Sequence, residues 1–459
     1  MIFTTIILAA GKGTRMKSEL PKVLHPLCGK AMIHYPVDAA REAGSEKIVT
    51  VIGHGADSVK EKLALKDMAF VVQEEQLGTG HAVMVCKDSV QDKSIPVVIL
   101  CGDAPLIQST TITGLVKSHL DNKNSVTVLT ADMENPQGYG RIIKDGSEIL
   151  RIVEEKDASH EEKCICEINS GVYCVDGEFL FKTLESVGKD NAQGEYYLTD
   201  IIKIGSEAGK KVGWSKITDS SETMGINSRK ELAEAGAIMR RRITDDLMAA
   251  GVTIIDPECT YIDGTVQVGR DSTIYPQVRL EGKTLVGENC AIESGAVIKD
   301  SHVGNDTHIK PYCVITDSRL GEKTAIGPFA HIRPASIISE GGKVGNFVEI
   351  KKATIGKGSK VNHLTYVGDA DVGQGVNIGA GTITCNYDGY RKFKTVIEDG
   401  AFIGSGTNLV APVTIGKGSV IGAGSTITKT VPPASLSLTR PEQRCIKGWP
   451  EKRRKERGE

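Results

Sequence analysis

A glycine-rich loop near the N-terminus has the composition of a phosphate-binding loop: Leu8-Ala9-Ala10-Gly11-Lys12-Gly13-Thr14-Arg15-Met16. Its small residues would let backbone N–H groups approach a phosphate chain closely, and Lys12 and Arg15 add positive charge. A further lysine, Lys22, follows Pro21 near the same predicted strand end. The loop matches neither G-x-G-x-x-G nor a P-loop, so a plain tight turn is the alternative.

A second candidate segment, Cys101-Gly102-Asp103-Ala104-Pro105-Leu106, closes a later predicted strand. A carboxylate at the C-terminal end of a strand, on a turn next to glycine, is well placed to hold Mg²⁺ on phosphate groups. Asp103 is therefore a candidate metal ligand. The alternative is that Asp103 only forms the turn before Pro105.

In the second half of the chain, charged residues interrupt positions that are otherwise small or apolar. The separation of Arg333 and Lys351, about 18 residues, is near the length of one coil in a solenoid of short repeats. Such a solenoid would place the two cations one above the other, and Tyr366 follows in the same region. This stacking is unfavourable unless an anion lies between the cations, and a phosphate is the natural candidate.

His363 belongs to the same region and is a candidate general base. Beside two cations it should stay neutral, which leaves it able to accept a proton. A buried structural histidine is the alternative. A zinc site is a rival interpretation, but no spacing clusters three of the candidate ligands His302, His308, His331 and His363.

The element that must position these residues is a repeat of six. Aliphatic residues recur every six positions at Ile397, Ile403, Leu409, Ile415, Ile421 and Ile427. This period fits neither an amphipathic helix nor an alternating strand. It fits a solenoid in which short strands form flat faces, so we predict a left-handed parallel β-helix of hexapeptide repeats. The repeat reaches back to Val268 with occasional slips of one residue, which implies about 17 or 18 residues per coil.

Two insertions are expected to interrupt the repeat, at Pro334–Lys343 and at Cys385–Val396. Loops that leave a regular solenoid are a usual place for binding residues. The second insertion contains Asn386-Tyr387-Asp388-Gly389 and is expected to project from its own coil toward a neighbouring chain.

The N-terminal half alternates predicted strands and helices. The strands are expected at Phe3–Leu8, Lys47–Ile52, Ala69–Val72 and Val97–Cys101, and the helices at Ala31–Glu42, Ala56–Leu65 and Gly80–Cys86. This order implies an α/β, Rossmann-like domain whose mostly parallel sheet binds ligands at the carboxyl ends of its strands. We expect this domain at 1–228, a helical linker at 229–250, the β-helix at 251–437 and a tail at 438–459.

Composition bears on the class of protein. At 459 residues the chain is too long for one hydrophobic core, so two or three domains are expected. The formal net charge is −2 and Lys452–Arg457 is a short basic run, so no nucleic-acid partner is expected. No apolar run is long enough to span a membrane, and the N-terminus lacks a basic leader. Eleven scattered cysteines without C-x-x-C pairs suggest reduced thiols in the cytoplasm.

The loop Leu8–Met16 and the Pro-Lys pair after it resemble the signature of the sugar nucleotidyltransferases. Members of that family join a sugar 1-phosphate to a nucleoside triphosphate and release pyrophosphate. The resemblance implies that Arg15 and Lys22 act in catalysis and that Asp103 and Asn227 hold Mg²⁺. Residues that match the family's nucleotide and sugar segments are Leu8, Ala9, Ala10, Gly11, Lys22, Gln73, Gly78, Thr79, Cys101, Gly102, Asp103, Gly140, Glu154, Asn169 and Asn227.

A nucleotidyltransferase fused to a long hexapeptide β-helix closely resembles the bacterial bifunctional N-acetylglucosamine-1-phosphate uridyltransferase/glucosamine-1-phosphate acetyltransferase family, over nearly the whole chain. The resemblance implies that His363 takes a proton from the amino group of glucosamine 1-phosphate, which then attacks the thioester of acetyl-CoA. The implied contacts of the acetyl acceptor are Arg333, Lys351, Tyr366 and Asn377. The implied contacts of acetyl-CoA are Ala380, Asn386, Tyr387, Ser405, Ala423 and Arg440.

The acetylated product would then react with UTP in the N-terminal domain to give UDP-N-acetylglucosamine, for peptidoglycan and lipopolysaccharide precursors. The resemblance also implies a cytoplasmic homotrimer, and we expect its acetyl-transfer sites to be shared between chains. Two alternatives remain open at this point. One is a sugar nucleotidyltransferase for another nucleotide, with the β-helix as a regulatory or assembly module; the other is a scaffold without enzymatic activity.

Overall fold

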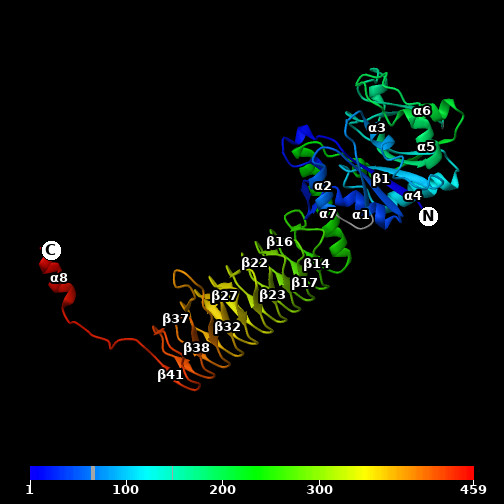
Figure 1. Ribbon diagram of the computed structural model, residues 1–459. Coiled ribbons are helices and arrows are strands. Elements are labelled where there is room, and N and C mark those ends of the chain that lie inside the picture. Colours follow the sequence, from blue (N-terminus) through cyan, green and yellow to red (C-terminus); the bar gives the residue numbers. More distant parts are fainter. Residues whose placement is uncertain (64–67, 147) are drawn as a thin grey trace. The chain divides into compact units, whose positions relative to one another are not determined.

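The computed structural model describes residues 1–63, 68–146 and 148–459 (Figure 1). The chain divides into two compact units, Met1–Met239 and Arg240–Glu459. No helix in the described part of the chain is long and apolar enough to cross a lipid bilayer.

The first unit is built on a mixed sheet with the strand order β11-β7-β10-β6-β1-β4-β5. Its main strands are β1 (Thr4–Ala9), β4 (Lys47–Ile52), β5 (Met68–Val72), β6 (Pro96–Cys101), β7 (Val126–Asp132), β10 (Glu167–Asp176) and β11 (Val212–Lys216). All neighbours in this order are parallel except β10, which runs antiparallel to β6 and β7. The sequence prediction of a mostly parallel sheet is thus confirmed. A hairpin of β8 (Arg141–Asp145) and β9 (Glu148–Val153) joins the sheet through β10.

Helices cover both faces of this sheet. The helices are α1 (His34–Glu42), α2 (Ala56–Lys62), α3 (Thr79–Met84), α4 (Ser109–Asp121), α5 (Gly177–Leu184) and α6 (Asp200–Glu207). Buried residues of α1, α2 and α4 share one apolar core, and those of α3, α5 and α6 share the other. Successive side chains of β1 enter opposite cores, Ile6 one and Ile7 the other, as the alternation of a strand requires. The predicted helix end at Leu65 lies outside the described residues.

Helix α7 (Arg229–Ala249) forms at the expected linker, and the boundary between the two units falls within it, after Met239. Its first half packs on the first unit. Arg229 Nε donates to the Met16 carbonyl (3.3 Å), Glu231 accepts the backbone N–H of Asn227 (2.7 Å), and Ala235 is fully buried. The first unit therefore extends about three helical turns beyond the expected boundary at 228.

The second unit is a parallel β-helix with three faces (Figure 1). Face I contains β12 (Thr253–Ile254), β15 (Thr273–Ile274), β18 (Ala291–Ile292), β21 (His308–Ile309), β24 (Ala325–Ile326), β27 (Lys343–Asn346), β30 (Lys360–His363), β33 (Asn377–Ile378), β36 (Phe402–Ile403), β39 (Val420–Ile421) and β41 (Leu436–Ser437). Face II contains β13 (Tyr261–Ile262), β16 (Arg279–Glu281), β19 (Val297–Lys299), β22 (Val314–Thr316), β25 (His331–Ile332), β28 (Glu349–Lys351), β31 (Tyr366–Gly368), β34 (Ile383–Cys385), β37 (Asn408–Val410) and β40 (Thr426–Ile427). Face III contains β14 (Gln267–Val268), β17 (Leu285–Val286), β20 (His302–Val303), β23 (Ser318–Leu320), β26 (Ser336–Ile338), β29 (Thr354–Ile355), β32 (Ala370–Val372), β35 (Thr395–Ile397) and β38 (Val413–Ile415).

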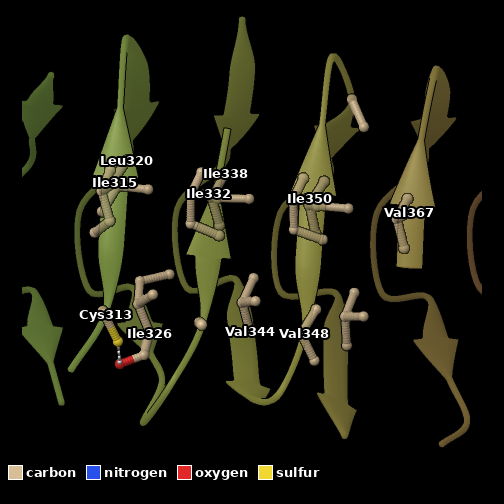
Figure 2. Packing of buried hydrophobic residues seen from close by; sticks show 14 of the residues in the cluster. Cys313, Ile315, Leu320, Ile326, Ile332, Ile338, Val344, Val348, Ile350 and Val367 are labelled. Carbon is tan, nitrogen blue, oxygen red and sulfur yellow. Dashed lines mark hydrogen bonds between the residues drawn. The ribbon is translucent and has the colours of Figure 1, made fainter. Parts of the chain in front are cut away.

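The aliphatic residues of the repeat point into this β-helix and stack from coil to coil. Figure 2 shows Ile315, Ile332, Ile350 and Val367 of face II following one another in this core, and each is fully buried. Hydrogen bonds between adjacent coils confirm the expected coil length. They join positions 17 apart, as for Asn346 and His363, and positions 18 apart, as for Ser272 and Cys290.

One of the two expected insertions is wrong. Residues Ser336–Ile338 form strand β26 of face III, and Ile338 is fully buried in the core (Figure 2). The six-residue repeat therefore continues through Pro334–Lys343. The other insertion is confirmed, because β34 ends at Cys385 and β35 begins only at Thr395. The last described element is a separate basic helix, α8 (Trp449–Arg457).

Candidate functional site

The carboxyl ends of β1 and β6 lie side by side in the first unit, because Leu8 pairs with Cys101. A cavity of about 320 Å³ opens there. Its lining contains ten residues expected from the sequence, namely Leu8, Ala9, Ala10, Gly11, Lys22, Gln73, Gly78, Thr79, Cys101 and Asp103. Gln76 and Glu195 also line it. Gln76 Nε2 donates to the carbonyl of Ala10 (2.7 Å) and so closes the loop after β1 from the side.

A second cavity of about 210 Å³ adjoins the first and shares Leu8, Thr79, Cys101 and Asp103 with it. Its lining contains the expected sugar-binding residues Gly140, Glu154 and Asn169, together with Tyr139, Tyr173 and Thr199. The backbone N–H of Asn169 donates to the Gly140 carbonyl (2.8 Å), which ties two of these segments together. The two cavities form one continuous site with room for a nucleotide and a sugar.

The turn at Gly78 explains why glycine stands there. Its φ is 107°, and a Cβ atom would lie 2.7 Å from the carbonyl oxygen of Tyr196. Gly78 also occupies the N-cap position of α3. The Thr79 hydroxyl accepts the backbone N–H of Leu198 (3.2 Å). Gln73 is buried and donates to the Gly78 carbonyl (3.2 Å), which fixes the turn.

The side chain of Lys22 contacts Asp103 and Asn227, the two residues expected to hold a metal ion. Its ammonium contacts a carboxylate oxygen of Asp103 and lies 3.0 Å from Oδ1 of Asn227. The backbone brings them together as well, since the N–H of Ile226 donates to the Asp103 carbonyl (2.9 Å). A carboxylate oxygen and an amide oxygen around one cationic position match the hard oxygen ligands of Mg²⁺. The residues present therefore fit this metal ion.

Burial sets the electrostatics of the sugar cavity. It raises the pKa of the Glu154 carboxyl, and a hydrogen bond from the Thr199 hydroxyl (3.3 Å) acts in the opposite direction. A carboxylate oxygen accepts hydrogen bonds from hydroxyl groups, which suits a sugar. Burial and the neighbouring Asp103 raise the pKa of the Cys101 thiol to about 12, so this thiol is not a nucleophile at neutral pH.

Three expected residues do not line either cavity. Asn227 is one of them, and it reaches the site through its contact with Lys22. Arg15 is exposed in the short helical turn Thr14–Met16. Gly102 supports the site from behind, because its N–H donates to the Leu8 carbonyl (2.9 Å). A Cβ atom at Gly102 would lie 3.1 Å from that same oxygen, so a larger residue would push β1 and β6 apart.

On face II of the β-helix, cations gather as the sequence predicted. Strand register places His331 beside Glu349, and Arg333 donates its backbone N–H to the Ile350 carbonyl (2.8 Å). Arg333 therefore lies one coil before Lys351. Lys392, from the insertion, adds a third cation: its ammonium, more than Arg333, lowers the pKa of Lys351. Two carboxylates lie near these cations: Glu349 Oε1 lies 2.6 Å from Nη1 of Arg333, and the charge of Asp369 acts to raise the pKa of Lys351.

The insertion begins by folding onto its own coil rather than away from it. Asn386 is buried, and its amide nitrogen contacts the carboxylate of Asp369 and lies 3.4 Å from the hydroxyl of Tyr366. The remainder projects, as expected, and Tyr390 is 92% exposed. A bridge between Tyr387 and Lys392 closes the loop and returns Lys392 to the cation cluster. We call Arg333, Glu349, Lys351, Tyr366, Asn386 and Lys392 the acceptor cluster.

His363 lies on a different face from the acceptor cluster. It ends β30 of face I, where its register partner one coil earlier is Asn346. The ring atom Nδ1 of His363 lies 2.5 Å from Oδ1 of Asn346. His363 is exposed, so the alternative of a buried structural histidine is wrong. Asn377 begins β33 on the same face, one coil further on.

Beyond His363, four of the six residues expected to contact acetyl-CoA follow one corner of the β-helix, whereas Asn386 and Tyr387 lie in the insertion. The Gly406 N–H donates to the Ala380 carbonyl (2.7 Å), and the Gly424 N–H donates to the Ser405 carbonyl (2.8 Å). Arg440 Nη1 donates to the Ala423 carbonyl (3.1 Å). The small residues Ala380, Ser405 and Ala423 thus stand at this corner on successive coils, the first of them one coil after His363.

A zinc site of histidines is not supported. His331 belongs to face II and His302 to face III, whereas His308 and His363 share face I but lie several coils apart. Among the described residues, no three His, Cys, Asp or Glu side chains are grouped closely enough to hold a metal ion.

Sequence reasoning did not single out Asn346, Glu349, Lys392 or Gln76 as site residues. Asn346 and Glu349 stand one coil before His363 and Tyr366, so the coil length locates each of them to within one residue. Lys392 reaches its position through the path of the insertion, which the repeat does not encode.

Comparisons with known proteins agree with this architecture. Residues 4–219 match the nucleotidyl transferase family, residues 257–341 the GMPPB C-terminal domain, and residues 394–429 the bacterial transferase hexapeptide family of six repeats. The hexapeptide match, with the parallel sheets, confirms the left-handed β-helix.

Similarity to curated proteins extends over almost the entire chain. The bifunctional protein GlmU of Syntrophotalea carbinolica is 54% identical, with 97% of this chain and 96% of that protein covered. The bifunctional protein GlmU of Geotalea daltonii is 53% identical over 97% of this chain and 98% of its own. That of Clostridioides difficile is 49% identical over 99% and 98%. With both units and both candidate sites inside these matches, the chain belongs to the GlmU family of bifunctional transferases.

Proposed function

We propose that the chain makes UDP-N-acetylglucosamine in two steps, one in each compact unit. The second unit transfers the acetyl group of acetyl-CoA to glucosamine 1-phosphate. The first unit transfers a uridylyl group from UTP to the product and releases pyrophosphate. The carrying observation is that one chain combines two joined cavities at the strand ends of the first unit with a separate cluster of three cations on the β-helix.

In the first unit, the nucleotide occupies the larger cavity and the sugar the smaller one. The base lies against Gln73 and the turn at Gly78 and Thr79, where buried amide and backbone groups can read its polar edge. The sugar hydroxyls face Gly140, Glu154 and Asn169. Because the cavities meet at Leu8, Thr79, Cys101 and Asp103, the sugar phosphate arrives next to the α-phosphate of UTP. Catalysis is then positioning plus charge stabilisation.

Asp103 and Asn227 are the proposed ligands of Mg²⁺. When bound, the ion would supply charge screening for the triphosphate. Lys22, whose ammonium contacts both residues, turns from their oxygens to the phosphates of the nucleotide. Arg15, exposed at the mouth of the loop, adds a further positive charge for these phosphates.

In the second unit, the phosphate of glucosamine 1-phosphate binds the cations Arg333, Lys351 and Lys392. An anion there relieves the repulsion that lowers the pKa of Lys351. Tyr366, Asn377 and Asn386 orient the sugar. Nε2 of His363 accepts a proton as the amino nitrogen attacks the thioester carbonyl, and the sulfur of CoA leaves. Ala380, Tyr387, Ser405, Ala423 and Arg440 accommodate acetyl-CoA.

The acetyl-transfer site is shared between chains of a homotrimer. His363 on face I and the acceptor cluster on face II point in different directions within one chain, so a neighbour that presents its own face I completes the site. An exposed apolar ridge supports assembly: Tyr312, Phe329, Phe347 and Leu364 occupy one corner on successive coils, and the first three rings stack at 5.3 and 5.4 Å. We place this assembly in the cytoplasm, with small-molecule substrates.

An omission experiment tests this function. The protein is incubated with glucosamine 1-phosphate, acetyl-CoA, UTP and Mg²⁺, and each is then left out in turn. UDP-N-acetylglucosamine should form only in the complete mixture. A nucleotide sugar that forms without acetyl-CoA, or from another nucleoside triphosphate in place of UTP, would favour a different sugar nucleotidyltransferase. No release of pyrophosphate with any nucleotide would contradict uridylyl transfer in the first unit.

A further inference from the structure

Arg141 is a buried cation that the proposed mechanism does not use. It begins β8, directly after Gly140 of the sugar cavity, and only 1% of its surface is exposed. A guanidinium in such surroundings is destabilising unless it is paired and hydrogen-bonded. Its ion-pair partner is Glu155, with Nη2 and Oε2 2.8 Å apart.

The guanidinium of Arg141 connects three chain segments. Besides Glu155, it donates through Nη1 to the carbonyl of Tyr139 and through Nη2 to the carbonyl of Lys163 (3.4 Å). Tyr139 belongs to the loop before β8, Glu155 follows β9, and Lys163 lies shortly before β10. A planar guanidinium with five N–H groups can serve three acceptors at fixed angles, whereas an ammonium on a flexible stem cannot.

Two of these segments present the walls of the sugar cavity. Tyr139 and Gly140 line it on one side, and Glu154, the neighbour of Glu155, lines it on the other. Arg141 is not part of the lining. Its Nε is buried and has no hydrogen-bond partner among the described residues, so the side chain faces protein and not the cavity. Any effect on the sugar must therefore pass through the segments that Arg141 holds.

We propose that Arg141, with Glu155, is a positioning residue for the sugar 1-phosphate. Its guanidinium fixes the spacing between the Tyr139–Gly140 loop and Glu154, and this spacing decides how well the sugar hydroxyls are bound. The nucleotide cavity has its own supports at Gln73 and Gln76 and does not depend on Arg141. This inference rests on the proposed uridylyl transfer.

The test uses full-length Arg141→Lys and Glu155→Gln. Lysine at 141 keeps the positive charge but lacks the planar guanidinium with its five N–H groups. Glutamine at 155 keeps an oxygen acceptor but loses the negative charge. The KM for N-acetylglucosamine 1-phosphate and the KM for UTP are measured separately. We expect Arg141→Lys to raise the sugar-phosphate KM by about 10- to 100-fold, since a misplacement of ~1 Å costs on this order, and to leave the UTP KM within about twofold. Glu155→Gln should also raise the KM for N-acetylglucosamine 1-phosphate, by a smaller factor, and leave the KM for UTP nearly unchanged.

The matched control is Arg151→Lys, which changes the same residue type on β9 at a half-exposed ion pair with Glu162 (2.6 Å). It should leave both KM values unchanged. Thermal unfolding of the purified chains reports whether the first unit of each variant folds, and if Arg141→Lys does not fold, Glu155→Gln decides by the same split. Unchanged sugar-phosphate KM, or equal rises in both KM values, overturns the proposal. A wild-type chain that makes no UDP-N-acetylglucosamine overturns the proposed function instead.

Discussion

Nδ1 of His363 and Oδ1 of Asn346 lie 2.5 Å apart on adjacent coils of face I. An amide oxygen can only accept, so this contact places the imidazole proton on Nδ1. The lone pair of Nε2 is then free to take a proton from an amine. The two residues thus have the geometry of a general base and the group that sets its tautomer.

His363→Ala should remove this base. We expect acetyl transfer to fall by ~10²–10⁴-fold, the range in which general bases commonly contribute. Uridylyl transfer to N-acetylglucosamine 1-phosphate should stay normal and serves as the internal control. A loss of acetyl transfer below tenfold would show that another group is the base.

Asn346→Asp should change the pH dependence of acetyl transfer rather than abolish it. A carboxylate beside the ring stabilises the protonated imidazolium, so the neutral base forms only at higher pH. The rising limb of the kcat profile should therefore move to higher pH. Asn346→Ala, as the matched variant, should lower kcat without this displacement. Identical profiles for both variants would argue against a tautomer-setting role.

Asp103→Asn should remove most uridylyl transfer, because the carboxylate that can hold Mg²⁺ and that pairs with Lys22 is lost. Acetyl transfer should remain near normal. The measurement is the rate of pyrophosphate release across a range of Mg²⁺ concentrations. Full uridylyl activity of the variant at low Mg²⁺ would falsify the assignment of Asp103.

A fragment that ends at Met239 should keep uridylyl transfer as a monomer and lose acetyl transfer. A fragment that ends at Ser228 should lose uridylyl transfer as well as acetyl transfer. It lacks Glu231, which accepts the backbone N–H of Asn227, and it lacks the buried Ala235. Size-exclusion chromatography and pyrophosphate release compare the two. Equal activity of both fragments would mean that the first half of α7 does not support the site.

Mixed trimers test whether a site is shared. Chains carrying His363→Ala are combined with chains carrying Asn386→Ala, and acetyl transfer is measured after separation of mixed from unmixed trimers. Some activity should return, since one type of chain can supply His363 and the other Asn386. Asn386 binds Asp369 and Tyr366 of its own chain, so the recovered site would pair one chain's face I with its neighbour's face II. Mixed trimers that regain nothing would place both residues in one chain.

Much of the architecture could be predicted because it is periodic. The six-residue repeat determines which side chains enter the β-helix, and the stacking of Arg333 and Lys351 follows from their separation by one coil. The expected insertion at Pro334–Lys343 is absent because Ile338 keeps the six-residue repeat between Ile332 and Val344. Glycines at the corners of coils are compatible with either structure.

Parts of the site depend on information that the repeat does not contain. Coils differ in length by a single residue, so sequence alone cannot decide whether Asn346 or its neighbour faces His363. Lys392 joins the acceptor cluster only because the insertion folds back at Tyr387. Arg141 and Glu155 meet across a hairpin, a contact with no periodic signal.

The β-helix also has a mechanical consequence. Each strand bonds only to the strands one coil before and one coil after it, so no contact links distant coils directly. Under tension from the C-terminal end, the unit should unzip one coil at a time, and each regular coil should release roughly 6 nm of chain. The coil from Asn377 to Phe402 is longer because it contains the insertion, and it should release roughly 8 nm. In a force–extension record, the coil with the insertion should therefore appear as one step longer than the others.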